Sequence, residues 1–338
     1  MRARGRTAPV ARLSAAGHVG GWSGGSIAPL GSGLQGEGGV AQTIVRKSPS
    51  TGEGSPDVWG FYEADTGSIQ YVAADPASGT AALIDVVWNF DPRHARTDTR
   101  SADEILEHVE REKLRVAWVL DTHPHADHLM ASAYLKEQLG APAAIGARVA
   151  DIAELWREIY HMPDAFDPRA AFDRLFEDEE RFEIGDLEAR VMLSPGHTLG
   201  SITFVVGDAA FVHDTLMYPD SGTSRADFPG GSARELYASI QRILALPDHT
   251  RTFVGHDYRE GGRAPAWEAT VAEQKATNKH LAGGVGEADY VAMREKRDTT
   301  LNLPDRILYA LQVNLSGGRL PEAEEDGHSY FRIPANRF

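Results

Sequence analysis

The sequence DTHPHADH, residues 121–128, follows directly after the apolar run RVAWVL at residues 115–120. A short, β-rich apolar run of this kind predicts a buried strand. Within six residues it is followed by four potential metal ligands, His123, His125, Asp127 and His128. In an extended segment the two leading histidines project to the same side, and a turn into the next helix brings the other two side chains round to face them. Imidazole and carboxylate groups suit zinc, iron or manganese, so this stretch predicts a metal site at a strand end.

Three more candidate ligands stand in the same place relative to predicted strands. They are His197 after the strand at residues 187–193, Asp214 after 209–212 and His256 after 252–254. The Pro195-Gly196 pair before His197 makes a tight turn that can aim the imidazole ring inward. Because every candidate follows a strand directly, we expect all of them to converge on one point.

The rest of the pattern mixes strands and helices. Gly185-Asp186 and Gly207-Asp208 each predict a hairpin turn, the first between strands at 182–184 and 187–193 and the second between 202–206 and 209–212. Strands are also expected at 68–74 and 80–88, and helices at 101–114, 129–139, 149–160, 233–246, 267–280 and 288–297, the first opened by a capping box from Ser101 to Glu104. Residues 301–338 are expected to be mostly irregular. The pattern is neither a βαβ repeat nor all-β, so it predicts an α/β (α+β) fold with antiparallel or mixed sheets covered by helices.

Composition narrows the classes of function. The 338 residues include 49 acidic and 34 basic side chains, 13 histidines and no cysteine. The net charge of −15 argues against a general nucleic-acid binder, which needs a basic face. Without cysteine there is no disulfide framework, no thiolate-bound metal and no thiol nucleophile, so His, Asp and Glu must hold any metal. No apolar run approaches the about 20 residues that span a bilayer.

The first 42 residues differ from the rest of the chain. They are rich in Gly and Arg, have no acidic residue before Glu37, and offer little apolar surface to bury. We expect a disordered or mis-assigned N-terminal extension over residues 1–42, the alternative being an organelle transit peptide. A single catalytic domain is expected over 52–338, with a helical or irregular C-terminal extension over about 262–338, and a cytoplasmic location.

The order of these motifs resembles the metallo-β-lactamase superfamily over about residues 55–260: His-x-His-x-Asp-His, then Pro-Gly-His-Thr, an Asp after a strand and a late Gly-His. The resemblance implies an αββα sandwich, in which two mixed β-sheets face each other, helices flank them and metal sits at one sheet edge. It makes His123, His125 and His197 the ligands of a first metal, Asp127, His128 and His256 those of a second, and Asp214 the bridge between the two.

Two loops resemble the persulfide (sulfur) dioxygenase and β-lactamase-like hydrolase branch of that superfamily. They are DTLMYPDSGTSRADFPGG at residues 214–231 and GHDY at 255–258. This resemblance implies one Fe(II) per chain, held by His123, His197 and Asp214, with the other four candidate ligands orienting the centre by hydrogen bonds. Two histidines and one carboxylate leave open positions for a substrate and O2. The implied reaction oxidises glutathione persulfide with O2 to sulfite and glutathione.

The same residues leave two other hypotheses open. A mono- or dinuclear zinc hydrolase of thioesters or lactones, similar to glyoxalase II, would use one or two Zn ions to lower the pKa of a bound water. A non-catalytic binding or sensing protein that keeps the fold is the third hypothesis. A nuclease is disfavoured by the charge of the chain.

Three residues beside the motifs have open roles. Arg225 is the candidate contact for a substrate carboxylate, the alternative being a structural pair with Asp227 or Asp220. Tyr258 is expected to line the pocket, the alternative being core packing. His213 stands where the family usually has Gly, and this departure leaves full catalytic competence open. No membrane or nucleic-acid partner is expected, and a homodimer is an open alternative.

Overall fold

The computed structural model describes residues 43–338, so the prediction for residues 1–42 lies outside the described residues. The first described strand, β1 (Ile44–Ser48), begins before the expected domain start at residue 52. That boundary is wrong because β1 pairs along its whole length with β2 (Asp57–Tyr62) and so belongs to the folded body. The four leading residues of β1 have exposed side chains, and its IVRKS sequence has no buried alternating face that predicts a strand.

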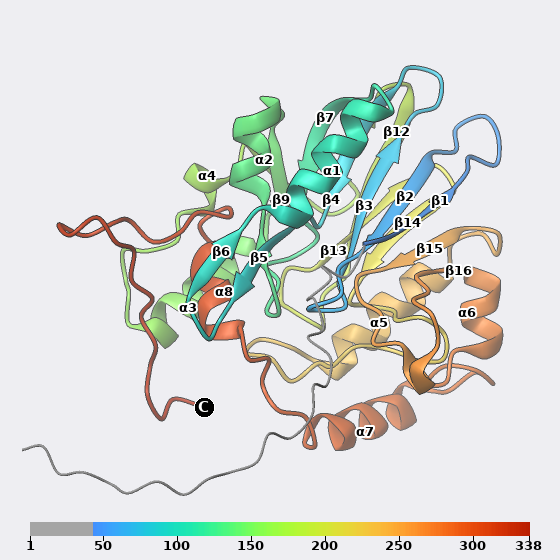
Figure 1. Ribbon diagram of the computed structural model, residues 1–338. Coiled ribbons are helices and arrows are strands. Elements are labelled where there is room, and N and C mark those ends of the chain that lie inside the picture. The colour runs from blue at the N-terminus through green and yellow to red at the C-terminus, as the bar shows by residue number, and fades with distance from the viewer. Residues whose placement is uncertain (1–42) are drawn as a thin grey trace, which may run out of the picture. The chain divides into compact units, whose positions relative to one another are not determined.

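Two large mixed sheets form the centre of the fold (Figure 1). The first has the strand order β1-β2-β3-β4-β7-β9-β10, where the further strands are β3 (Ile69–Ala74), β4 (Thr80–Ile84), β7 (Arg115–Leu120), β9 (Ala143–Gly146) and β10 (Arg174–Phe176). The second runs in chain order through β11 (Arg181–Ile184), β12 (Leu187–Leu193), β13 (Ile202–Val206), β14 (Ala209–His213), β15 (Arg251–Val254) and β16 (Glu268–Thr270). A small third sheet joins β5 (Val87–Asp91), β6 (Arg96–Asp98) and β8 (Leu129–Met130).

Aromatic side chains lock the inner faces of the two large sheets together. Tyr71 of β3 contacts Phe211 of β14 and Phe253 of β15, with ring centroids 5.3 and 5.6 Å apart. At the other end Phe176 of β10 packs on Phe182 of β11 at 4.7 Å. All five rings are buried, so the space between the sheets is a close-packed apolar core.

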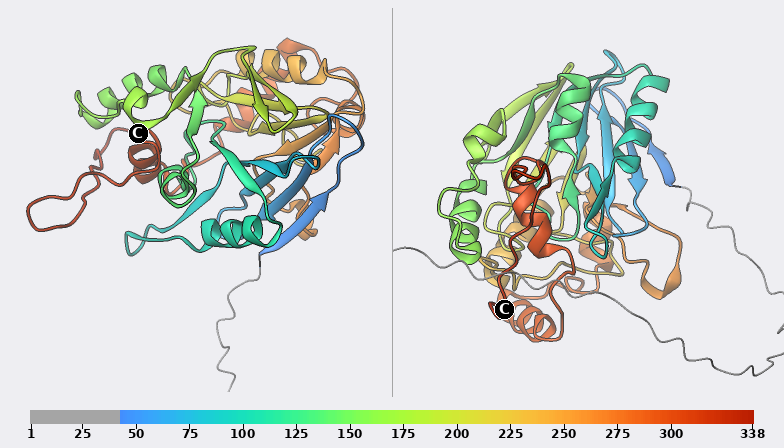
Figure 2. Two further views of the ribbon diagram at one scale, coloured as in Figure 1. Left: turned by 90° about the horizontal axis from the view of Figure 1, so that it is seen from above. Right: turned by 60° about the vertical axis from the view of Figure 1, so that its left-hand side comes forward.

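Helices cover both outer faces, as two views show (Figures 1 and 2). The first sheet carries α1 (Arg100–Arg111), α2 (Ser132–Leu139), α3 (Val149–Tyr160), α4 (Pro168–Ala171) and α8 (Ile307–Asn314), whose apolar residues share one core with it. The second carries α5 (Ala233–Leu244), with α6 (Val271–Thr277) and α7 (Glu287–Asp298) in the same core. The predicted αββα sandwich of two mixed sheets flanked by helices is confirmed.

Several element boundaries differ from the expected ones. The expected strand 80–88 is broken between β4 and β5, where Asp85 adopts a left-handed backbone with φ 53°. The capping box at Ser101 is wrong, because α1 begins at Arg100 and Ser101 lies inside it. A capping box does form at Thr270 and Glu273, and it makes α6 start after a short strand in place of the helix expected from residue 267.

The expected C-terminal extension, residues 262–338, carries α6, α7 and α8. Asn314 at the end of α8 donates to the backbone oxygens of His125 and His128, at 2.8 and 2.9 Å, and accepts from the backbone nitrogen of Met130. This part of the chain therefore supports the histidine-rich loop directly. Between residues 43 and 338, no helix combines the length and the apolar character needed to cross a bilayer.

Candidate metal centre

The candidate ligands lie where the ends of the two large sheets meet. The loops after β7, β12, β14 and β15 carry them, as the spacing of the sequence predicts. Two backbone hydrogen bonds tie two of these loops to strands of the other sheet, from Ile202 N at the start of β13 to Thr122 O (3.0 Å) and from Ile69 N at the start of β3 to Gly255 O (2.8 Å). The loops after β7 and β15 are thus fixed by backbone contacts to the opposite sheet, which brings side chains far apart in sequence close together.

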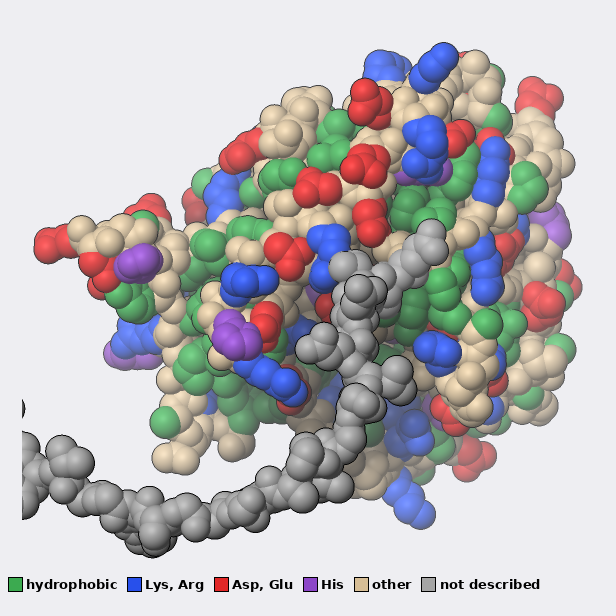
Figure 3. All heavy atoms as spheres, in the orientation of Figure 1, with side chains coloured by type: hydrophobic (Ala, Val, Ile, Leu, Met, Phe, Trp, Pro, Cys, Tyr) green, Lys and Arg blue, Asp and Glu red, His purple; other side chains and the backbone are tan. Residues whose placement is uncertain are grey.

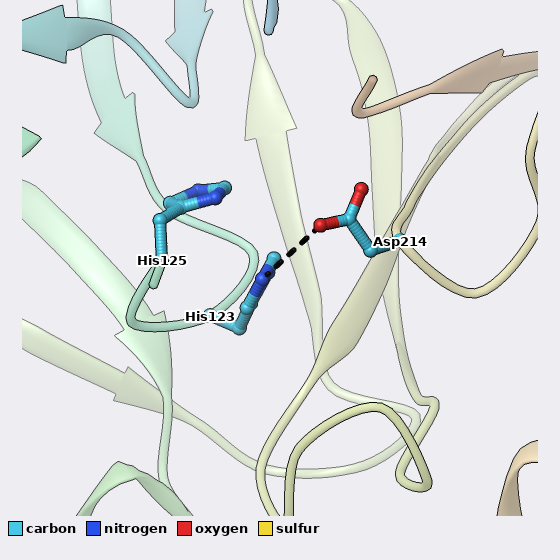
Figure 4. Close-up of side chains that lie close together, drawn as sticks. All are labelled: His123, His125 and Asp214. Carbon is cyan, nitrogen blue, oxygen red and sulfur yellow. Dashed lines mark ion pairs between the residues drawn. The ribbon is translucent and has the colours of Figure 1, made fainter. Parts of the chain in front are cut away.

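His123, His197 and Asp214 form the centre of the cluster. Asp214 Oδ2 lies 3.7 Å from His123 Nε2 and 3.6 Å from His197 Nε2. Figure 4 shows the His123 ring and the Asp214 carboxylate pointing toward each other, with the His125 ring beside His123. All four side chains are buried. A ligand nitrogen of His123, one of His125 and a carboxylate oxygen of Asp214 lie within 4.8 Å of one another, a spacing that could hold a metal ion.

The turn before His197 aims its ring as expected. Gly196 has φ +127°, and a Cβ there would lie 2.1 Å from the backbone nitrogen of Leu236 in α5. Only glycine fits so close to a helix backbone in this conformation. His197 Nδ1 lies 2.9 Å from the carbonyl oxygen of Arg225, to which it donates. That bond leaves Nε2 free to face Asp214.

Asp85 is a site residue that the sequence analysis missed. Its buried carboxylate accepts hydrogen bonds from Thr122 N (2.7 Å) and Thr122 Oγ1 (2.8 Å), and its Oδ1 lies 3.1 Å from His125 Nε2. Thr122 Oγ1 in turn lies 3.0 Å from His123 Nδ1. One carboxylate therefore orients two candidate ligands, the kind of support that metal-binding histidines usually have. The sequence did contain a signal for this role. Asp85 is an ionisable residue inside the apolar run AALIDVVW, and a buried carboxylate needs hydrogen-bond partners.

Asp127, His128 and His256 form a second group, whose side chains lie within hydrogen-bond distance of one another. His256 Nε2 lies 2.6 Å from Asp127 Oδ2, and its Nδ1 lies 2.7 Å from Asp214 Oδ1. His128 Nδ1 lies 3.1 Å from the same Asp127 oxygen. The hydroxyl of Ser68, also missed from the sequence, lies within hydrogen-bond distance of all three residues of the group.

The imidazole rings of the two groups differ in charge: His123 in the first group is neutral, whereas His256 in the second is protonated. Burial opposes ionisation of Asp214, but the charges of His256 and His197 outweigh it and hold the pKa of Asp214 well below its usual value. Burial and the neighbouring imidazoles lower the pKa of His123 far below its usual value, so its ring is neutral, the form that binds a metal. Burial also lowers the pKa of His256, but the Asp127 and Asp214 carboxylates outweigh it and raise that pKa well above its usual value.

His213 fits its position through a strained but tolerated backbone. Its φ of 39° lies in the left-handed region that favours glycine, where histidine is one of the better-tolerated alternatives. Its buried ring lies 5.2 Å from that of His123, and its Nε2 lies 2.9 Å from Thr215 Oγ1. Burial lowers the pKa of His213 to about 3, so it adds a neutral ring beside the centre.

A cavity of about 380 Å³ opens onto Asp127, His197 and Asp214. Tyr258 lines it as expected, with its ring stacked on His256 at 5.8 Å and 66% exposed. Arg225 also lines it, but its guanidinium is held by Asp227 through contacts of 2.6 and 2.8 Å and donates to Asn302 O at 2.6 Å. Arg225 therefore forms the structural pair with Asp227 that was the alternative to a carboxylate contact.

The residues present fit a metal ion. Buried polar atoms rarely lack a partner, yet among the described residues His123 Nε2, His125 Nδ1 and His128 Nε2 have no hydrogen-bond partner. Two ligand atoms about 2.1 Å from one metal lie roughly 3–4 Å apart at ordinary coordination angles. The 3.6 and 3.7 Å separations around Asp214 Oδ2 fall in that range. Nitrogen and carboxylate oxygen donors suit iron, zinc and manganese alike.

Known proteins share this sequence and fold. The family model described as "Metallo-beta-lactamase superfamily" matches residues 71–256. A "Beta-lactamase hydrolase-like protein" of Agrobacterium fabrum is 57% identical over 279 residues, which cover 82% of this chain and 64% of that protein. This chain thus spans less than two thirds of that relative.

More distant relatives match over nearly their whole length. "Glyoxylase B2" of Dictyostelium discoideum is 38% identical, covering 82% of this chain and 96% of that protein. "Persulfide dioxygenase ETHE1, mitochondrial" of Bos taurus is 28% identical, covering 81% and 93%. The crystal structure of ETHE1 from Myxococcus xanthus superposes with a TM-score of 0.62 at 27% identity, covering 82% of this chain and 100% of that one. The His and Asp cluster within this fold supports a metal cofactor, and the relatives are both hydrolase-like proteins and persulfide dioxygenases.

Proposed function

The chain belongs to the metallo-beta-lactamase superfamily, and from this premise we propose that it is an iron-dependent persulfide dioxygenase acting on glutathione persulfide. One observation carries the proposal: Asp214 Oδ2 lies 3.7 Å from His123 Nε2 and 3.6 Å from His197 Nε2, while Asp127 and His256 are hydrogen bonded to each other. Two histidines and one carboxylate with open positions are typical of non-haem Fe(II) oxygenases.

The reaction balances as glutathione persulfide plus O2 plus water giving glutathione, sulfite and two protons. A bound Fe(II) would supply the adjacent open positions at which the persulfide sulfur and O2 meet. The chain supplies the rest: Asp85 and the Arg225 carbonyl orient the histidine rings, and the cavity holds the thiol carrier next to Asp214. Because the chain has no cysteine, it offers no thiol to exchange with a persulfide.

The cavity offers two cations to an anionic substrate. Four basic side chains line it, and two of them are already paired: Arg225 with Asp227, and Arg294 with Asp298. Arg297 makes no side-chain hydrogen bond or ion pair within residues 43–338, and Lys279 reaches Glu260 only at 3.7 Å. We assign carboxylate recognition to Lys279 and Arg297. In a chain of net charge −15, these two side chains give the cavity positive groups that can contact the carboxylates of glutathione. On the face drawn in Figure 3 acidic and basic side chains are interspersed.

The experiment is anaerobic loading with iron, followed by O2 uptake and sulfite assay with glutathione persulfide. One sulfite per O2 is expected, and the absence of O2 uptake by iron-loaded protein would refute the proposal. The variants His123→Ala, His197→Ala and Asp214→Ala should each lose iron, whereas Asp127→Ala should keep most of it. Equal metal loss in all four would favour a dinuclear centre.

A zinc hydrolase of thioesters or lactones is the second candidate, because His125, Asp127 and His128 offer a second group of donors that could hold a metal, and His256 contacts Asp127 beside them. The 38% identity to a protein named as a glyoxylase also favours it. In that case the protein would bind two zinc ions per chain and turn over a glutathione thioester without consuming O2.

A further inference from the structure

Ser68 stands at the centre of the group formed by Asp127, His128 and His256. It precedes β3 and pairs with His256 in an isolated antiparallel bridge, so its backbone is fixed against the loop after β15. Its hydroxyl oxygen lies 3.0 Å from His256 Nε2, 3.1 Å from His128 Nδ1 and 3.2 Å from Asp127 Oδ2. The residue is 1% exposed, so the hydroxyl faces only these groups and its own loop.

The loop of Ser68 is itself anchored. The buried carboxylate of Glu63 accepts from Thr66 Oγ1 at 2.7 Å and from Thr66 N at 2.8 Å. Thr66 Oγ1 lies 2.6 Å from Ser68 Oγ. The contact with Thr66, which is itself bonded to Glu63, therefore fixes the orientation of the Ser68 hydroxyl.

Asp127 shares with His125 and His128 a spacing of donor atoms, all within 4.8 Å of one another, that could hold a metal ion, but its contact with His256 is too short for two ligands of one metal. Two ligands on one zinc or iron lie at least about 3 Å apart, given bonds of about 2.1 Å and angles of 90° or more. Asp127 Oδ2 and His256 Nε2 are 2.6 Å apart, a hydrogen-bond distance. His128 Nδ1 and Ser68 Oγ complete a closed set of contacts around the same carboxylate oxygen.

We propose that Ser68 is a positioning residue that holds Asp127, His128 and His256 as one hydrogen-bonded group and so keeps the second metal position of the fold closed. This inference rests on the proposed function, which requires one metal per chain. Removing the hydroxyl leaves Asp127 Oδ2 as the remaining side-chain partner of His128 Nδ1 and His256 Nε2, so the three side chains are held less firmly and can turn more easily onto a cation. The affinity for a second metal should then rise by about 10-fold or more.

The test is the metal stoichiometry of Ser68→Ala, measured by elemental analysis after equilibrium dialysis against Zn²⁺ and by the d–d absorption of Co²⁺-loaded protein. The wild-type chain should hold one ion and Ser68→Ala close to two under the same free metal. Ser68→Thr keeps the hydroxyl and should hold one. The control is Ser101→Ala, which removes a buried hydroxyl from α1, and it should also hold one.

A single ion in Ser68→Ala, or two ions in the wild-type chain, would overturn the role of Ser68. The wild-type measurement keeps the proposal open to refutation even if Ser68→Ala does not fold. The two proposals fail differently: wild-type protein with one metal and no O2 uptake would refute the dioxygenase and leave the Ser68 comparison intact.

Discussion

Replacing Asp85 by Asn should weaken metal binding about 100-fold with little change in the fold. The carboxylate touches His125 directly and reaches His123 through Thr122. Removing one orienting partner of a metal-binding histidine costs about tenfold or more in affinity. Two histidines together give about 100-fold, or about 2.7 kcal/mol. Asn is well suited to test the charge alone, because it keeps the size of the side chain and tolerates the left-handed backbone at φ 53°.

The assay is competition for Zn²⁺, or anaerobically for Fe²⁺, against a chromophoric chelator of known affinity. Thr122→Val cuts only the path to His123 and should lose about tenfold. Asp91→Asn is the control, because Asp91 pairs with His94 in an exposed ion pair away from the cluster. A dissociation constant for Asp85→Asn within about threefold of wild type would refute the reasoning. An unchanged Thr122→Val would refute the indirect path to His123.

Three further predictions concern the loop before His197, the response to pH and substrate binding. Gly196→Ala should destabilise the fold by more than about 3 kcal/mol in urea unfolding and lose metal, because the new Cβ would lie 2.1 Å from the backbone of α5. The control is Gly140→Ala, where φ is +66° but the space is open, and it should cost only about 1 kcal/mol. Burial opposes ionisation of Asp208, but the buried Arg251 outweighs it and lowers the Asp208 pKa, so the pair stabilises the fold at neutral pH and the stability is lost as the pH falls below about 4. Asp208→Asn should therefore lower the unfolding free energy by about 3 kcal/mol at pH 7 and by much less at pH 3; an equal loss at both would refute the assignment. Arg297→Ala should raise KM for glutathione persulfide about 2- to 5-fold with kcat unchanged, and an unchanged KM would remove this arginine from carboxylate recognition.

The sequence predicted the features that short-range rules govern. Gly185 and Gly207 both have positive φ in tight turns between antiparallel strands, as the Gly-Asp pairs indicate. The convergence of His123, His197 and Asp214 followed from one regularity, that each residue comes directly after a strand. Strand ends that share an edge bring such residues together without any long-range information in the sequence.

What the sequence could not reveal depends on partners that are distant along the chain. Ser68 is one ordinary polar residue before a strand, and its role appears only when the loop after β15 lies beside it. Asp85 looked like part of a continuous strand because the left-handed turn that exposes its carboxylate to Thr122 has no glycine to mark it. Arg225 has its partner two residues away, but the sequence could not decide between that pair and a substrate carboxylate, and the contact with Asn302 lies 77 residues along the chain.

Donor identity and donor spacing carry different information about a metal centre. Asp127 and His256 are of the same chemical types as Asp214 and His197, and from the sequence both pairs are equally good ligands. In the fold one pair stands 3.6 Å apart and the other 2.6 Å apart, a difference of 1.0 Å that separates room for a cation from a hydrogen bond. Under the proposal of one metal per chain, the groups that fix these spacings, Asp85 on one side and Ser68 on the other, set the number of metals. Asp85→Asn should accordingly weaken the affinity of the single site, whereas Ser68→Ala should allow a second metal ion to bind.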